Sequence, residues 1–322
     1  MSWEKIARRR RRETRKVGEF DLQTRWGWMI TASLFFEGTG AGLFFVSFVT
    51  SLVTGVPISY LNWGFLIGPI LGALGVLSLF LELGHKERFA RVFANLKESW
   101  LSRGALFDTL FIVFALIYYV WPDADKSSSL GLVIGGIGAI GAFLVMIYTG
   151  LVQSAIPGIP FWNSAALPLL SLTYSLMSGV GGMFVIAWAW WCRVCGTPEY
   201  LGTFSLAETT LIVISMIILS VYLIVSYSSR VEAKASTIYL VKGKMSRLFA
   251  MGIVVGLILP LVITVYSSMQ FLAADAFNSM TYNLLLVAGL MIYVGYLLLR
   301  YGLIASGIHA LLDPILLEKP VE

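Results

Sequence analysis

Eight long apolar runs constrain the fold of this 322-residue chain more than any other feature. Each run has about twenty residues or more, which is the length that an α-helix needs to cross the hydrocarbon core of a bilayer. Outer-membrane barrels show instead segments of about ten residues with alternating hydrophobicity. The pattern therefore predicts an all-α polytopic membrane protein with eight transmembrane helices. The runs lie near residues 26–54, 60–84, 104–122, 129–155, 165–192, 205–229, 246–269 and 281–307.

Composition supports this class of protein. Hydrophobic residues make up 58% of the chain and charged residues 13%, whereas soluble domains hold about 25% charged residues. The first apolar run follows a basic N-terminal segment and is too long for the core of a cleavable signal peptide. We therefore expect an integral protein of the inner cell membrane without a cleaved leader.

The basic residues gather on one side of the predicted bundle. With eight spans, both termini and the loops after spans two, four and six share that side. Of the 23 Lys and Arg residues, only Lys126 and Arg193 fall in the opposite loops. The positive-inside rule therefore predicts that both termini are cytoplasmic. A net charge of +5 arranged in this way favours anionic lipid or an acidic partner, and we expect no nucleic acid.

The chain is predicted to have four parts joined by short connections. Similar small-residue runs at 38–44 and 178–184 lie in the first span of each half. They indicate a parallel repeat of two bundles, although glycine packing alone can produce so short a match. The predicted parts are a basic cytoplasmic tail (1–25), a first four-helix bundle with the candidate site (26–164), a second four-helix bundle (165–310) and a C-terminal tail (311–322).

The local structure of three segments between the spans can also be predicted. Residues 84–93 are expected to form a short amphipathic helix at the membrane surface. Residues 230–245 are expected to form a loop. Residues 156–164 hold two prolines and a glycine within four positions, which excludes regular helix there and predicts a cap over spans four and five.

Glu37 is the ionisable residue that stands out within the apolar runs. A charge near the centre of a transmembrane helix costs about 2.5–3.5 kcal/mol, so such a residue usually faces the bundle interior and marks a proton or ligand path. Gly38, Gly40 and Gly42 follow it and would let a second helix or a flat ligand approach the backbone closely. The alternative is a glycine packing seam in which Glu37 is simply neutralised.

Other ionisable residues leave more than one interpretation open. Arg103 and Asp108, at the start of span three, could pair or sit separately. Glu208, early in span six, could continue a proton path, although a helix N-terminus favours an acid in any case. Glu82 ends span two, where solvent exposure is the simpler interpretation. Arg300, in span eight, is expected to extend its side chain to the membrane surface.

The residue inventory excludes several cofactors. The chain has two histidines, His85 and His309, so two bis-histidine haems are excluded, and one would require these distant residues to converge. Cys192 and Cys195 are too few for an iron–sulfur cluster or a zinc site, and they are either unconnected thiols or a reversible disulfide. Walker-type phosphate loops are absent, which argues against ATP hydrolysis. We therefore expect no haem, cluster or metal in this chain.

Five motifs together resemble the polysulfide reductase membrane-subunit family of the NrfD/PsrC type. Their order and spacing along the chain fit that family, and the number of spans fits over nearly the whole length. The sequence departs from the family at Glu82, where an Asp is more frequent. The motifs are Phe36-Glu37-Gly38-Thr39-Gly40-Ala41-Gly42, Leu81-Glu82-Leu83-Gly84-His85-Lys86-Glu87-Arg88-Phe89, Ser99-Trp100-Leu101-Ser102-Arg103-Gly104, Tyr148-Thr149-Gly150-Leu151-Val152-Gln153-Ser154 and Pro160-Phe161-Trp162-Asn163-Ser164.

The resemblance implies an eight-helix subunit, usually without haem, that exchanges electrons and protons with membrane quinone, either menaquinone or ubiquinone. It also implies a ferredoxin-like iron–sulfur partner subunit and, beyond it, a molybdopterin or other catalytic subunit. A chain without a redox centre can host quinone chemistry if a docked partner supplies the electrons. The electron direction and the side on which the partner docks stay open.

A quinone site needs an apolar slot, hydrogen bonds to two carbonyl oxygens and a route for protons. We expect Glu37 to relay protons, with Glu82, Asp108 and Glu208 as further positions on a proton path. The quinone pocket is predicted to contain Tyr148, Trp162, Asn163, Gly40 and His85; an interfacial aromatic belt is the alternative explanation for Tyr148 and Trp162. The competing function is a secondary transporter or a proton-translocating membrane module.

Overall fold

The computed structural model describes residues 21–53, 56, 58–82, 96–97, 99–194, 200–274 and 279–310. Within this part of the chain, eight helical segments are long and apolar enough to cross a membrane, which confirms the predicted fold class. One of them joins α9, η4 and α10. The spans are α2 (Trp28–Val53), α3 (Ile58–Glu82), α4 (Trp100–Val120), α5 (Ser129–Ser154), α6 (Ala166–Val194), α7 (Tyr200–Ser228), α9 (Ser246–Ile253) with η4 (Val254–Ile258) and α10 (Leu259–Ala274), and α11 (Ser279–Ala305).

Two short elements lie between the spans. The 3-10 turn η3 (Asp123–Asp125) connects α4 to α5, and the helix α8 (Val231–Val241) connects α7 to α9. The prediction of a loop over 230–245 was therefore wrong, since eleven of these residues are helical and contain neither Gly nor Pro. Residues 156–164 contain no regular helix, as predicted. The amphipathic helix expected at 84–93 lies outside the described residues, as does Cys195.

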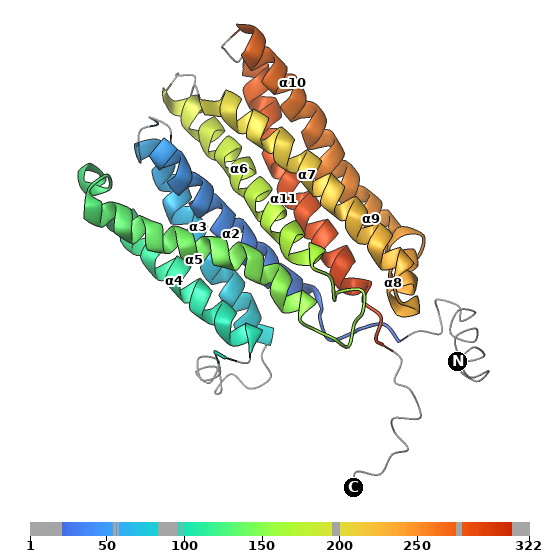
Figure 1. Ribbon diagram of the computed structural model, residues 1–322. Helices are drawn as coiled ribbons and strands as arrows, with labels where there is room; N and C mark the ends of the chain where they lie inside the picture. The colour runs from blue at the N-terminus through green and yellow to red at the C-terminus, as the bar shows by residue number, and fades with distance from the viewer. Residues whose placement is uncertain are drawn as a thin grey trace, which may run out of the picture.

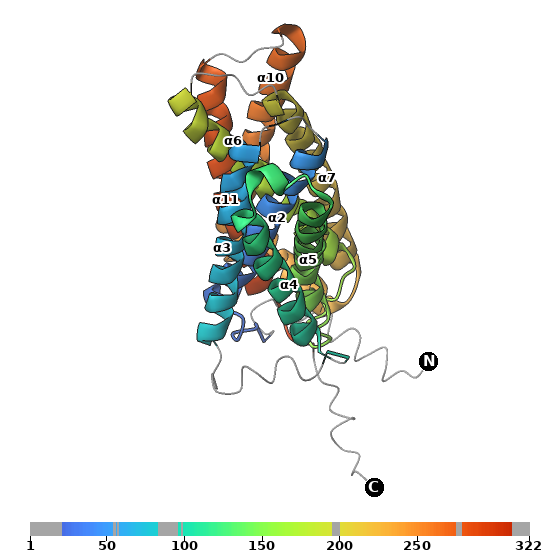
Figure 2. The same cartoon turned by 90° about the vertical axis from the view of Figure 1, so that its left-hand side faces the viewer.

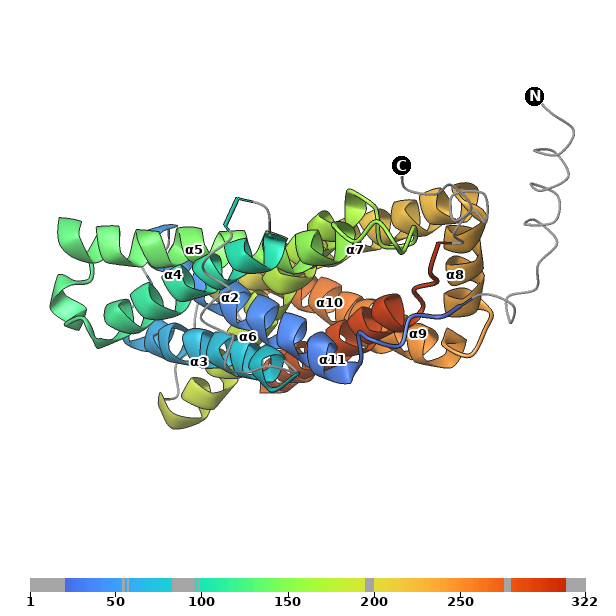
Figure 3. The ribbon, with the colours of Figure 1, turned by 90° about the horizontal axis from the view of Figure 1, so that it is seen from below.

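Helices α2 and α6 form the centre of the bundle. Each has 78% of its most apolar window buried, more than the other spans. α3 and α5 pack on α2, and α7 and α11 pack on α6, while α4 and α10 lie further out on the two sides (Figure 1). Seen from below, the first four spans lie at one end of an elongated bundle and the last spans at the other (Figure 3). A boundary between two bundles at residues 164–165 stays a prediction.

The two described chain ends meet at one end of the bundle, which we call the terminal face (Figure 2). Leu22 and Ile308 form an antiparallel bridge. The backbone N–H of Gln23 donates to the Gly307 carbonyl at 2.9 Å. The backbone N–H of Ala310 donates to the Gly158 carbonyl at 2.8 Å, so the connection after α5 is fastened to the same end.

The glycines of the stripe in α2 face neighbouring helices on two sides: Gly38 and Gly42 face α6, and Gly40 faces α3. A Cβ on Gly38 would lie 2.6 Å from Ser175 Oγ of α6 and 2.7 Å from the Tyr296 hydroxyl of α11. A Cβ on Gly40 would lie 2.6 Å from the backbone nitrogen of Gly72 in α3. Small residues of this kind allow transmembrane helices to pack backbone against backbone. The stripe is therefore occupied by helix packing rather than by open space.

The π-helical turn η4 has a local cause. Pro260 cannot donate a backbone hydrogen bond, and its ring collides with the carbonyl four residues earlier in a regular α-helix. The widened turn directly before it, Val254–Ile258, accommodates that collision. The same turn brings Gly256 against Gly295 of α11, where a Cβ would lie 2.6 Å from the Gly295 Cα.

Candidate functional site

Polar side chains gather at one depth inside the bundle. Counted from the helix ends at the terminal face, Glu37, Asp108, Tyr148, Ser171 and Arg300 each lie five to nine residues into α2, α4, α5, α6 and α11. At 1.5 Å per residue, this places their backbones about 8–14 Å below that end of the bundle. Residues far apart in the sequence thus form one buried polar layer.

Glu37 is enclosed, as the sequence predicted. Its side chain is 1% exposed, and its Oε1 accepts a hydrogen bond from Ser33 Oγ at 2.8 Å. Its Oε2 has no partner among the described residues. A Cβ on Gly75 of α3 would lie 2.6 Å from Glu37 Cγ, so that glycine makes the room that this side chain fills.

Asp108 and Tyr148 share this layer with Glu37 and are close enough to its carboxyl group to interact with it electrostatically. Asp108 is 5% exposed, and its Oδ1 has no partner among the described residues. The Tyr148 ring packs on Gly104, one helical turn before Asp108. We call Glu37, Asp108 and Tyr148 the acidic cluster. Glu37 and Asp108 can each hold or release a proton in a place removed from water, and the Tyr148 hydroxyl can donate a hydrogen bond there.

Arg300 lies inside the bundle, so the prediction that it extends to the membrane surface was wrong. It is 4% exposed. Its Nη1 donates to Ser171 Oγ at 2.6 Å, and its Nη2 donates to the Thr149 carbonyl oxygen. The guanidinium group interacts electrostatically with Glu37. Its acceptors come from α5 and α6, and no local sequence signal identifies them.

Two tyrosines complete the layer and were not predicted from the sequence. The rings of Tyr174 and Tyr296 lie 5.5 Å apart, and Tyr296 lies 5.2 Å from Phe35. Neither tyrosine hydroxyl has a partner among the described residues. Both sit within aliphatic and aromatic sequence, where a tyrosine looks like an ordinary core residue.

Unpaired buried polar atoms concentrate in this layer. Folded proteins pair the large majority of their buried polar atoms, so a group of unpaired ones calls for an explanation such as a catalytic role or a bound polar group. The layer also contains Arg300, which supplies a positive charge. Within the described residues, the unpaired atoms here are Glu37 Oε2, Asp108 Oδ1, Tyr174 OH, Ser175 Oγ, Tyr296 OH and Arg300 Nε.

Trp162, Asn163 and Gly40 occupy structural positions. Trp162 is fully buried, donates from Nε1 to the Leu303 carbonyl at 3.1 Å, and lies 5.1 Å from the Trp26 ring. Asn163 is exposed and donates from Nδ2 to the Ser154 carbonyl at 3.3 Å. Gly40 faces α3, as described above. Their roles in a quinone pocket stay predictions.

The remaining predicted positions lie apart from the acidic cluster. Glu82 is exposed at the end of α3, and His85 lies outside the described residues. Arg103 does not pair with Asp108, because its guanidinium donates to the carbonyls of Leu96 and Lys97 instead.

Glu208 marks a second buried site. Its side chain is 0% exposed, and neither carboxylate oxygen has a partner among the described residues. It lies eight residues into α7, counted from the face opposite to the terminal face, and interacts electrostatically with Tyr293 of α11. Polar pairs lie nearby between α7 and α10, since Thr209 Oγ1 donates to Thr264 Oγ1 at 3.0 Å.

No group of three or more His, Cys, Asp or Glu side chains is arranged around a metal position in the described part of the chain.

Comparison with known proteins identifies the protein's relatives. The family model described as "Polysulphide reductase, NrfD" matches residues 19–311. The polysulfide reductase C subunit of Wolinella succinogenes is 24% identical over 306 residues, covering 88% of this protein and 94% of that one. The match spans all eight helices and every member of the buried polar layer, and the protein therefore belongs to the polysulphide reductase NrfD family.

Proposed function

We propose that the protein is the quinone-reactive membrane subunit of a respiratory oxidoreductase complex. It would exchange electrons between an iron–sulfur partner subunit and membrane quinone, with proton uptake or release at the acidic cluster. The observation that carries this proposal is the burial of Glu37, Asp108 and Tyr148 together at one depth of the bundle. Family membership supports the same conclusion.

The chemistry of the acidic cluster fits this reaction. Interconversion of a quinone and its quinol moves two electrons and two protons, so a site needs groups that hold protons next to the reacting oxygens. Glu37 and Asp108 can each carry one proton. The Tyr148 hydroxyl can donate a hydrogen bond to a carbonyl oxygen. Arg300 offsets the negative charge that remains when Glu37 loses its proton.

We further propose that both termini are cytoplasmic. The described basic residues of the terminal face include Arg103, Arg230, Lys242 and Arg247, whereas Lys126 lies at the opposite face. This asymmetry follows the positive-inside rule. A reporter that fluoresces only in the cytoplasm, fused after residue 322, should be bright; a dark, correctly inserted fusion would contradict this orientation.

The test of the proposed function is quinone turnover by the purified complex with Glu37→Gln, which keeps the shape of the side chain and removes its acid. We expect quinol oxidation or quinone reduction to fall by about 10²–10⁴-fold, the usual contribution of a positioned acid or base. Asp125→Asn is the matched control, because Asp125 is an exposed acid at the opposite face. Unchanged turnover in an intact Glu37→Gln complex would refute the role of Glu37.

Glu208 favours a second candidate function, proton translocation through the second half of the protein. A buried carboxyl group without a hydrogen-bond partner among the described residues, beside the hydroxyl pairs of α7 and α10, is typical of a proton relay. In proteoliposomes, Glu208→Gln should leave quinone turnover intact and abolish acidification or alkalinisation of the lumen. Proton movement equal to that of the unmodified complex would refute this function.

A further inference from the structure

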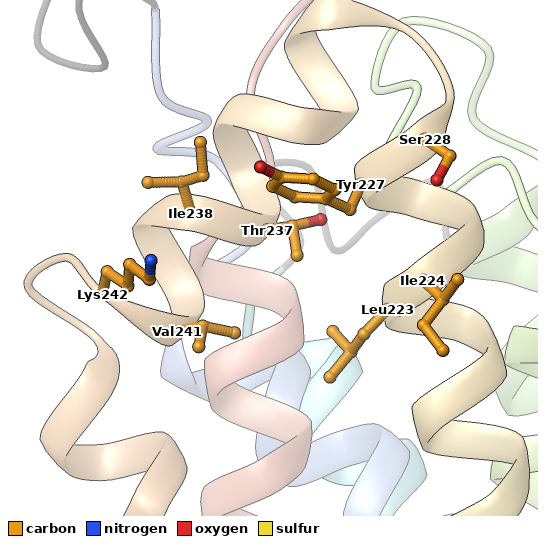
Figure 4. Close-up of a pocket in the computed structure, with 8 residues that line it drawn as sticks. All are labelled: Leu223, Ile224, Tyr227, Ser228, Thr237, Ile238, Val241 and Lys242. Carbon is orange, nitrogen blue, oxygen red and sulfur yellow. The ribbon is translucent and has the colours of Figure 1, made fainter.

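A groove of about 440 Å³ lies between the end of α7 and the short helix α8 (Figure 4). Its volume is within the range of about 300–1,000 Å³ that is typical of small-molecule sites. Leu223 and Ile224 of α7 and Val241 of α8 make its wall largely aliphatic. Lys242, directly after α8, lies on its rim.

The aliphatic wall continues along the outer surface of α7. Ile217, Val221 and Ile224 are 58%, 50% and 66% exposed. Their spacing of four and three residues places them on one stripe of the helix. In a protein with eight membrane spans, an exposed aliphatic stripe of this kind contacts lipid acyl chains. The groove thus lies where this lipid-facing surface ends, and Lys242 lies on its rim.

The chain segment that borders the groove is positively charged. Residues 230–247 contain five basic residues and one acidic residue, Glu232, which is only 5% exposed. The Lys234 ammonium group lies 4.9 Å from the centre of the Tyr227 ring, which lines the groove. Lys242 is exposed, and no described residue forms an ion pair with it. The apolar slot therefore ends at Lys242, a cation that remains available to an anion.

We infer that this groove binds one anionic membrane phospholipid, with its phosphate at Lys242 and an acyl chain against Leu223 and Ile224. Charge complementarity selects this occupant: anionic headgroups attract Lys and Arg at the membrane surface, and basic pockets between helices hold such headgroups. An uncharged quinone headgroup would leave the Lys242 ammonium group without a counter-charge. None of the residues that line the groove belongs to the acidic cluster, so the inference does not depend on quinone chemistry.

The experiment is a titration of the purified complex with phosphatidylglycerol or phosphatidylcholine in mixed micelles, followed by native mass spectrometry. Lys242→Gln should bind phosphatidylglycerol about five-fold more weakly than the unmodified complex, the effect of one cation at an anionic lipid surface. Lys244→Gln is the matched control, since Lys244 is also exposed but does not line the groove. It should bind phosphatidylglycerol as the unmodified complex does.

A second variant tests the apolar part of the site. Val241 is 43% exposed, so Val241→Trp can fill the groove without disturbing the core. It should reduce the amount of co-purified phosphatidylglycerol while the subunits stay together. The inference is overturned if phosphatidylcholine binds equally well, if Lys242→Gln and Lys244→Gln lose the same affinity, or if added quinone displaces the phospholipid. These readouts do not require electron transfer, so they separate this inference from the proposed function.

Discussion

Gly42 of α2 and Gly179 of α6 lie against each other where the two most buried spans cross. A Cβ on Gly179 would lie 2.6 Å from the Gly42 carbonyl carbon, and a Cβ on Gly42 would lie 3.5 Å from the Gly179 nitrogen and collide with the Ser175 backbone. These glycines belong to the two similar small-residue runs of the sequence. The runs therefore meet at the centre of the bundle.

This crossing predicts that Gly42→Ala destabilises the protein. The added methyl group would force α2 and α6 apart, at a cost of about 1–3 kcal/mol. Thermal unfolding of the purified complex measures the effect. Gly136→Ala is the control, because nothing lies within 4 Å of a Cβ at that position. Equal unfolding temperatures for the two variants would contradict the close packing.

Arg300→Met should lower both stability and activity. The change leaves Ser171 Oγ and the Thr149 carbonyl without their buried donor, a loss of about 1–3 kcal/mol. It also removes the positive charge that acts on Glu37. Thermal unfolding and quinone turnover measure the two effects, with Arg247→Met as an exposed control. If Arg300→Met behaves as Arg247→Met does in both assays, Arg300 has no role in the buried layer.

Trp162→Phe tests how much the hydrogen bond of Trp162 to α11 stabilises the protein, apart from the packing of its ring. The ring that packs against Trp26 is largely retained, but the donor to the Leu303 carbonyl is lost, which should cost about 0.5–1.5 kcal/mol. Trp28→Phe is the control, because Trp28 is 61% exposed. A rise in the KM for quinone with unchanged stability would instead place Trp162 at the quinone.

Asp123, at the face opposite to the terminal face, should stabilise the folded protein to an extent that depends on pH. The hydrogen bond from Lys126 to Asp123, at 2.5 Å, holds the pKa of that carboxyl below its ordinary value. Lys126 is 1% exposed, and its ammonium also donates to Asn62 Oδ1 at 3.0 Å. Asp123 itself is largely exposed, so solvent screening limits its contribution to about 0–1 kcal/mol.

The sign of this pH dependence follows from the lowered pKa. Because the folded protein binds a proton at Asp123 less readily than the unfolded chain does, the stabilisation is present at neutral pH and fades as the pH falls below about 4. Asp123→Asn should therefore unfold at a lower temperature than the unmodified protein at pH 7, and the difference should shrink in acid. A difference that stays constant down to pH 3 would exclude this titration.

The sequence was sufficient to predict the spans. Each of the eight apolar runs corresponds to a helical span, because the bilayer sets the length of an apolar helix and satisfies no backbone hydrogen bonds. It also predicted that Glu37 is buried, since an ionised group in a spanning helix avoids lipid. The helix α8 was missed because its mixture of charged and aliphatic residues has no strong periodicity.

The sequence did not predict all the residues that form the buried layer, because some of them are brought there only by the tertiary structure. Arg300 lies five residues from the end of its helix, a position equally suited to an arginine that reaches the membrane surface. Its inward direction depends on acceptors from α5 and α6. Tyr174 and Tyr296 have no local signal that distinguishes them from core aromatics.

The sequence by itself determined that this protein crosses the membrane eight times, because hydrophobic length is a property of each segment alone. The tertiary structure decided which helix covers Gly38, Gly40 and Gly42, which side Arg300 faces, and where the groove beside Lys242 lies. These features depend on which helices become neighbours. That choice results from side-chain packing and hydrogen bonds between distant segments, which no single segment encodes.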